Sequence, residues 1–158
     1  MSELGVKVRA AHVDDAAALV KVLRQADRDE LQAIGSTDFQ GDIEKSIAGS
    51  VLAFSSTIDG EIACIFGVGG ASLIGGTAVV WCLSADIPRK HRRVFAKGSV
   101  WWRDYFLARF PVMMNAIDDR NIATKRWLKW LGASFAEPAP AGPDGRMFTL
   151  FELRASHV

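Results

Sequence analysis

The feature that most constrains the fold is a buried strand, a long helix and a second strand in direct succession. The run TAVVWCL at 77–83 is nearly continuously apolar, which predicts a strand buried on both faces. Pro88 suits the first turn of a helix that continues to about Arg109. The run VMMNAI at 112–117 predicts the next strand. Because crossover helices join parallel strands, we expect these two strands to be parallel.

Local patterns predict the remaining elements. Asp14 is a plausible N-cap of the first helix, and Asp59-Gly60 between two strand-like runs is a strong hairpin signal. Gly132 is the expected C′ residue of the last helix. The order β-α-α-β-β-β-α-β-α-β-β predicts a single α+β domain over residues 1–158, with a mixed sheet. The expected strands lie at 6–10, 51–58, 61–68, 77–83, 112–117, 133–136 and 147–153, and the expected helices at about 15–26, within 38–49, at 88–109 and at 122–131.

Composition excludes several classes of partner. A chain of 158 residues that is 49% hydrophobic is large enough to bury one core. The net charge of +1 gives no global electrostatic reason to expect nucleic acid or a membrane surface as a partner. No apolar run approaches the roughly 18 residues of a membrane span, and the N-terminus has no signal-like segment. We therefore expect a protein that is not secreted and has no membrane span.

The cysteines and histidines give no metal-ligand pattern. Cys64 and Cys82 lie in apolar runs, and the three histidines lie far apart in sequence. We expect two buried thiols and no metal, with a disulfide or a metal site as the alternative.

The segment 121–135, NIATKRWLKWLGASF, resembles the second half of the acyl-CoA-binding motif of the GNAT family of N-acetyltransferases. The resemblance places the family's Asn at Asn121, its small residue at Ala123 or Thr124, and its Gly at Gly132. The expected element order is also that of the GNAT fold. The resemblance therefore implies a GNAT-like acyl-CoA N-acyltransferase fold and acetyl-CoA as a possible ligand. The contacts that it implies for acetyl-CoA are Val80, Trp81, Cys82, Leu83 and Asn121.

One catalytic residue of that family is missing. The Tyr that protonates the leaving thiolate aligns with Leu128, whose apolar side chain cannot donate a proton. Some members lack this Tyr and let the thiolate leave unprotonated or through water. The candidate catalytic residues are Asn121 and Glu30. Glu30 lies between the first two expected helices, where the family often binds its acceptor; the alternative is a solvated carboxylate at a helix end.

The segment 84–94, SADIPRKHRRV, stands where the family has a Gly-rich turn for the CoA pyrophosphate. It contains no glycine, Pro88 removes one backbone donor, and Asp86 places a negative charge beside any bound phosphate. Binding of phosphate by side chains is one interpretation, and a solvated helix start or a contact surface for an acidic partner is the other. The basic residues concerned are Arg89, Lys90, His91, Arg92 and Arg93.

The tryptophans favour an exposed aromatic surface. Trp101 and Trp102 are adjacent on an expected helix, so they point about 100° apart and cannot both face one core. Trp127 and Trp130 lie on the last helix. We expect at least one of the four to be partly exposed and to favour a protein contact surface, with ordinary core packing as the alternative.

Four stretches resemble the internal virion protein A-like family of T7-like podoviruses and their prophage relatives. They are KVRAAHVDD, IFGVGGASLIGG, the segment 121–135 and GRMFTLFEL. The resemblance implies a phage-encoded protein located in the virion or the host cytoplasm. Its partners would be other phage or virion proteins, or further copies of itself.

Two functions follow from these observations. The missing Gly-rich turn and Leu128 predict a degenerate acetyl-CoA site in a virion-associated or virion-assembly protein. The alternative is an active acetyl-CoA-dependent N-acetyltransferase that acts on an amine or a protein N-terminus. An enzyme needs an open cleft between the strands at 77–83 and 112–117, whereas a structural protein can fill it with Trp81 or Met114.

Overall fold

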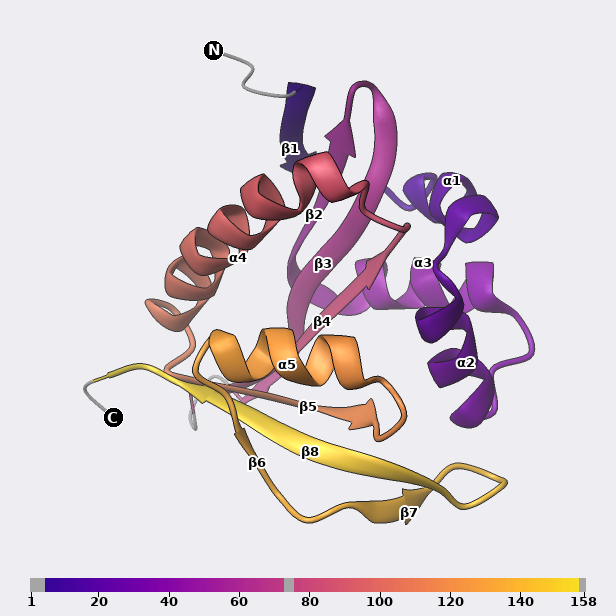
Figure 1. The fold of residues 1–158 in the computed structure, drawn as a ribbon, viewed down its shortest axis with the longest axis vertical. Helices are drawn as coiled ribbons and strands as arrows, with labels where there is room; N and C mark the ends of the chain where they lie inside the picture. Colours follow the sequence, from indigo (N-terminus) through magenta and orange to yellow (C-terminus); the bar gives the residue numbers. More distant parts are fainter. Residues whose placement is uncertain (1–4, 73–75, 157–158) are drawn as a thin grey trace.

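The computed structural model describes residues 5–72 and 76–156, in which a mixed sheet carries helices on both faces (Figure 1). The strand order is β1-β2-β3-β4-β5-β8-β6, and β7 pairs with β8. The strands are β1 (Val6–Ala10), β2 (Ser50–Ile58), β3 (Glu61–Ser72), β4 (Thr77–Ser84), β5 (Val112–Asp118), β6 (Ser134–Phe135), β7 (Ala139–Ala141) and β8 (Arg146–Arg154). The helices are α1 (Asp15–Val22), α2 (Gln25–Ala33), α3 (Phe39–Gly49), the short 3-10 helix η2 (Arg89–His91), α4 (Arg92–Leu107) and α5 (Ile122–Trp130).

The pairing of the strands agrees with the expected topology. β4 and β5 are parallel, as their separation by a long helix predicts, and the other neighbouring strands are antiparallel. The hairpin between β2 and β3 turns at Asp59 and Gly60, whose φ angles are 52° and 84°. Two consecutive positive φ angles are the geometry of a type I′ turn, so the Asp-Gly prediction is confirmed.

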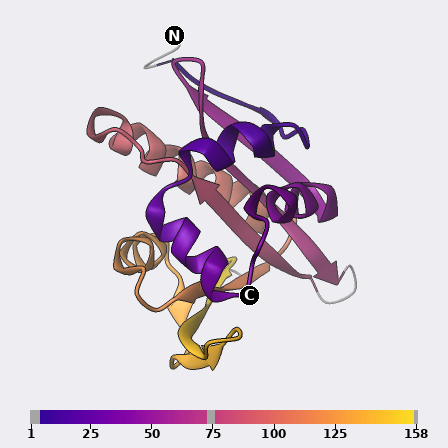
Figure 2. The same cartoon turned by 90° about the vertical axis from the view of Figure 1, so that its right-hand side faces the viewer.

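The two faces of the sheet bury separate cores. α1, α2 and α3 lie on one face, and α4 and α5 lie on the other (Figure 2). Leu19, Ile43 and Ile65 are fully buried on the first face, and Val68, Phe106 and Met113 are buried on the second. Each helix thus presents one apolar stripe to the sheet.

The first helix is shorter than the sequence predicts. We expected one helix over about 15–26, but the backbone is extended at Leu23 (ψ 129°) and Arg24 (ψ 153°), and α2 begins after it. The cause is tertiary: the Arg24 N–H donates to the Ser84 carbonyl at 2.9 Å, and Leu23 forms a β-bridge with Ala85. The chain therefore has three helices before β2 instead of two.

Two further predictions differ in detail, and a third is confirmed. Asp14 holds the N-cap position of α1, but its side chain makes no capping hydrogen bond; Asp15 instead accepts from the His12 N–H at 2.8 Å. The loop at 137–145 contains the short edge strand β7, which includes Pro140 and was not expected. Gly132 has φ 97°, as expected for the residue that ends α5.

The expected exposure of at least one tryptophan is confirmed, and a protein contact surface there stays a prediction. Trp101 and Trp130 are 58% and 59% exposed, whereas Trp102 packs against Phe54 with ring centroids 4.4 Å apart. Both cysteines are free thiols. Among the described residues, no group of three or more histidine, cysteine or acidic side chains is arranged to hold a metal ion. In the same part of the chain, no helix has both the length and the apolar character that crossing a membrane requires.

The break between α1 and α2 yields a test of stability. Asp27 is 1% exposed and accepts hydrogen bonds from the Arg24 guanidinium and the Ser84 N–H. We predict that Asp27→Ala lowers the free energy of unfolding by about 3 kcal/mol, because it leaves a partly buried guanidinium without its carboxylate. Urea titration would measure this change.

Asp29→Ala is the matched control, since Asp29 lies on the same helix and bonds only to the exposed Gln25 side chain. Its effect should stay within about 0.5 kcal/mol. Equal losses in the two variants would contradict the assignment of Asp27.

Candidate functional site

β4 and β5 pair at their first residues and then separate. Their register runs from Thr77 opposite Val112 to Val79 opposite Met114, although both strands continue for several residues beyond this point. The next contact between them is made by a side chain: Asn115 Nδ2 donates to the Val80 carbonyl at 2.8 Å. The two strands therefore diverge toward their carboxyl ends.

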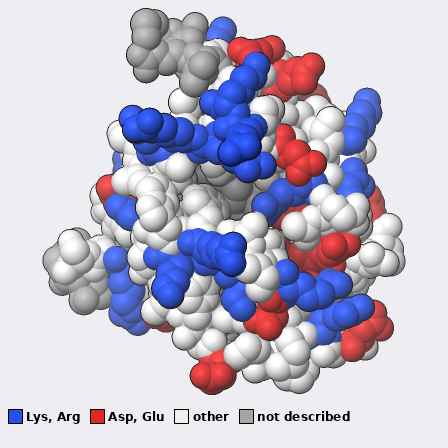
Figure 3. Space-filling model, viewed as in Figure 1, with Lys and Arg blue, Asp and Glu red and all other residues white. Residues whose placement is uncertain are grey.

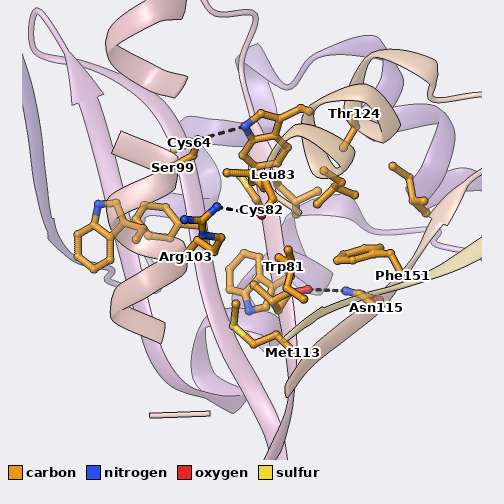
Figure 4. Close-up of a pocket in the computed structure, with 18 of the residues that line it drawn as sticks. Cys64, Trp81, Cys82, Leu83, Ser99, Arg103, Met113, Asn115, Thr124 and Phe151 are labelled. Atoms are coloured by element: carbon orange, nitrogen blue, oxygen red, sulfur yellow. Dashed lines mark hydrogen bonds between the residues drawn. The ribbon is translucent and has the colours of Figure 1, made fainter. Parts of the chain in front are cut away.

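A cavity of about 420 Å³ lies at this divergence. β4 contributes Val80, Trp81, Cys82 and Leu83 to its walls, so all four expected contacts on this strand line it. Figure 4 shows Cys82 and Leu83 from β4 beside Thr124 from α5 and Phe151 from β8. Neither Trp81 nor Met114 closes the cleft. Trp81 packs toward α1 and α3, where its Nε1 donates to Ser50 Oγ at 2.8 Å.

Three polar side chains of α2 and its N-cap hold the diverging ends of the strands. Asp27 accepts from the N–H of Ser84, the last residue of β4, at 2.9 Å. Glu30 Oε1 accepts from the N–H of Asp118, the last residue of β5, at 2.8 Å. Arg24 forms a two-point ion pair with Asp27. The carboxylates thus replace the hydrogen bonds that paired strands would have made.

Glu30 also lines the cavity. Its burial raises the pKa of the carboxyl group to about 7, against the lowering effect of the Asp118 N–H. Asp27 and Asp118 raise it further by charge repulsion. A carboxyl group that titrates near neutral pH is ionised in part of the molecules and can take a proton from an amine.

The backbone of β4 offers a free edge in the same cleft. The Val80 carbonyl and the Ser84 N–H both point toward the β5 side, where Asn115 and Asp27 bind them. Because alternate residues of a strand direct their N–H and C=O to the same edge, those of Cys82 also face the cleft. β5 has left the register at this level. An extended chain that carries amide groups can pair there.

Asn121 has one satisfied and one free polar atom. It is buried and caps α5, since its Oδ1 accepts from the Thr124 N–H at 3.3 Å. Its Nδ2 is buried and has no hydrogen-bond partner among the described residues. A buried donor without a partner usually meets a ligand or water.

The basic cluster divides into two parts. Arg89, Lys90, Arg92 and Arg93 are exposed at η2 and the start of α4. Figure 3 shows lysine and arginine side chains gathered there and again over α5, on either side of a hollow. His91 is 3% exposed, with Nε2 3.7 Å from Asp59 of the β2–β3 hairpin, so it does not join this surface.

Leu128 is buried and lines the cavity, so no acidic hydrogen stands at the position of the family's Tyr. The two cysteines also line the cavity. A hydrogen bond to Cys64, together with burial, raises the pKa of the Cys82 thiol well above its usual value. This thiol therefore stays protonated near neutral pH.

Sequence reasoning gave no role in this site to two residues: Asn115, in the expected strand at 112–117, and Arg24, in the expected helix at about 15–26. Asp27 falls with Glu30 in the region where the family often binds its acceptor, but its hydrogen bond to the end of β4 was not expected. The spacing of Arg24, Asp27 and Glu30 at intervals of three is the signal that places them on one face of a helix. This spacing could be interpreted only once the break between α1 and α2 was known.

The sequence matches no family model, and no curated protein matches it. Solved structures do match it along nearly its whole length. The ribosomal-protein-S5-alanine acetyltransferase of Vibrio fischeri is 14% identical, with a TM-score of 0.67 over 96% of this chain and 94% of that chain. An acetyltransferase of Salmonella typhimurium that modifies the N-terminal serine of ribosomal protein L7/L12 is 10% identical, with a TM-score of 0.69 over 99% and 98% of the two chains. The protein yncA of Salmonella typhimurium, solved with its cofactor acetyl-CoA, is 16% identical, with a TM-score of 0.63 over 95% and 94%.

These structures correct the functional expectation. We expected a virion-associated or assembly protein, and this was wrong, because the proteins that share the architecture are acetyltransferases. The open cleft between β4 and β5 agrees with the correction. At identities of 9–16% the likeness establishes the architecture alone. The chain has the GNAT acetyltransferase fold.

Proposed function

We propose that this protein is an acetyl-CoA-dependent N-acetyltransferase that acts on an amine. The observation that carries the proposal is the cavity between the separated strands β4 and β5, into which Glu30 brings a carboxyl group of pKa about 7. A catalytic base is most effective when its pKa lies near the working pH.

The residues of the cleft fit acetyl-CoA. The free edge of β4 at Cys82 suits the amide groups of an extended pantetheine arm. Asn121 does not line the cavity, but its buried, unpartnered Nδ2 at the start of α5 is a donor that suits a carbonyl oxygen. The exposed Arg89, Arg92 and Arg93 suit the negatively charged phosphates. When bound, acetyl-CoA supplies an acetyl group activated as a thioester.

The chain's own groups supply the acid–base chemistry. Glu30 in its ionised form takes the proton that the amine nitrogen loses as it forms the new bond. The apolar lining from Leu83, Phe148 and Phe151 keeps water away from the reacting groups. The hydrogen bond from Asp118 N–H fixes the orientation of the Glu30 carboxylate in the cavity.

We predict that the protein binds acetyl-CoA. The double substitution Arg92→Ala and Arg93→Ala should weaken this binding at least tenfold, because it removes two positive charges that attract phosphate. Each charge contributes about 1 kcal/mol to the binding free energy. Titration calorimetry at two salt concentrations would measure both affinities. Since charge attraction is screened by salt, the parent should lose more affinity than the variant at high salt.

Lys45→Ala is the control, because Lys45 is an exposed cation on α3, on the opposite face of the sheet. This variant should bind as the parent does. Absence of saturable heat at about 1 mM ligand, which limits the binding free energy to about −4 kcal/mol or weaker, would refute the proposed function.

We predict that acetyl transfer to amines depends on pH through Glu30. The base is the ionised form, so kcat/KM should rise with pH up to about 7 and level off above it. Glu30→Gln keeps an oxygen for the Asp118 N–H but cannot take a proton, so kcat should fall by about 10²- to 10⁴-fold. Transfer to a polyamine and to peptides with free N-termini would be followed by release of the CoA thiol.

The raised pKa of Glu30 also predicts that stability changes with pH in the opposite direction to activity. The folded state holds the Glu30 proton more tightly than the unfolded chain does, so the stability of the parent should decrease as pH rises from about 4.5 to 7. The contribution is on the order of 3 kcal/mol and should be absent in Glu30→Gln. Identical pH profiles of unfolding in the two proteins would contradict the assignment of Glu30.

A further inference from the structure

The hydroxyl group of Thr124 is held in an unusual way for a helical residue. Arg24 Nη2 donates to Thr124 Oγ1 at 2.9 Å across the gap between α2 and α5. The hydroxyls of Ser46, Ser50 and Ser99 donate to carbonyls three or four residues earlier, at 3.0, 2.6 and 2.6 Å. In the described part of the chain, the Thr124 hydroxyl accepts a hydrogen bond but donates none to α5. Its proton is therefore free for another partner.

Thr124 lines the cavity, and Figure 4 shows it on α5 above Leu83. Its hydroxyl can therefore direct its free proton toward a ligand in the cavity. Three other polar groups on the walls already bind protein partners. Ser99 donates to the Ala96 carbonyl, Asn115 donates to the Val80 carbonyl, and Arg103 donates to the Leu131 carbonyl.

Helix geometry places this hydroxyl where a tyrosine at position 128 would end. Thr124 and Leu128 are four residues apart on α5, and both line the cavity. Side chains on a helix lean toward its N-terminus, so a long side chain at position 128 would cover the turn that contains Thr124. A donor at Thr124 would therefore lie one helical turn before position 128, on a short side chain instead of a long one.

Building on the proposed function, we propose that Thr124, oriented by Arg24, is the hydrogen-bond donor to the sulfur atom of the acyl-CoA thioester as it becomes an anion. Thr124 would contact the reacting sulfur, and Arg24 is a positioning residue. The amine nitrogen forms the bond to the acyl carbon, and the C–S bond breaks with its electron pair going to sulfur. Glu30 takes the proton from nitrogen, Thr124 keeps its own, and the CoA thiolate leaves.

The neighbouring charges agree with a role in stabilising an anion. The Arg24 guanidinium is the nearest group, and its bond to the Thr124 oxygen polarises the O–H toward the cavity. Asp27 is paired with Arg24, and Lys125 is paired with Asp119. Of the titratable or charged side chains, Glu30, Cys64, Cys82 and Arg103 line the cavity. Arg24 and Asp27 contact Thr124 or each other, and the backbone N–H of Asp118 binds Glu30.

Binding of CoA itself tests this proposal without turnover. If Thr124 stabilises the sulfur anion, bound CoA should ionise at a pH about one unit below the free thiol value of about 8.5. The affinity for CoA relative to desulfo-CoA, which lacks the sulfur, should then rise about tenfold between pH 6.5 and 9.5. Titration of the protein's own groups affects both ligands and cancels in the ratio.

Thr124→Val removes the hydroxyl at nearly constant volume, and the ratio should then change less than threefold over this range. Thr124→Ser retains a hydroxyl and should behave as the parent. Thr57→Val removes a hydroxyl in β2 from a residue that does not line the cavity, and should also leave the ratio unchanged. In turnover, Thr124→Val should lower kcat by about 10- to 100-fold while KM for acetyl-CoA stays constant.

The outcomes separate this proposal from the proposed function. If the parent binds CoA and transfers acetyl groups but its CoA to desulfo-CoA ratio is flat with pH, Thr124 is not the donor and the transferase function stands. The same holds if Thr124→Val keeps the tenfold rise. If the parent binds neither ligand, both proposals are overturned.

Discussion

The separation of β4 from β5 is the constraint on which the rest of the structure depends. Parallel strands that diverge leave backbone N–H groups without partners, and each such group costs free energy if it is buried unpaired. Here Asp27 and Glu30 accept the terminal N–H groups of the two strands, at 2.9 and 2.8 Å. The cleft stays open because a third element, α2, completes the hydrogen bonding that the strands give up.

The same arrangement explains the chemistry expected of Glu30. Its carboxylate must reach the end of β5 from α2, which places it inside a largely apolar cavity where the charged form is poorly solvated. Asp27 differs from Glu30 in that it forms an ion pair with Arg24 at 2.9 Å. Glu30, with the backbone N–H of Asp118 as its partner, has a pKa raised to about 7. A structural requirement has produced a base suited to neutral pH.

The sequence predicted most of the fold and only part of the site. Regular hydrophobic runs located every strand except β7, and Asp59-Gly60 fixed a hairpin, because local chemistry decides these features. The break at Arg24 was missed, since it arises from a hydrogen bond to Ser84, sixty residues away in the chain. The residues of the site also divide into those that could be predicted from the sequence and those that depend on tertiary contacts. The residues on β4 were implied by the resemblance to the GNAT motif, whereas the partners of Glu30 and Thr124 come from elements brought together only by folding.

The two departures from the GNAT motif, the missing Gly-rich turn and the missing Tyr, affect different steps: the binding of CoA and the departure of its sulfur. A Gly-rich turn offers backbone N–H groups to phosphate, and in the proposed function the exposed arginines at η2 and α4 take their place with side-chain charges. That exchange affects affinity and its dependence on salt, because mobile surface charges are screened. The loss of the Tyr affects only the departure of sulfur. A thiol with a pKa near 8.5 leaves readily as an anion, so stabilising it takes one well-placed donor rather than a full proton transfer. If Thr124 acts as proposed, its hydroxyl, held by Arg24, meets that smaller requirement, and the absence of the Tyr is then a poor argument against catalysis.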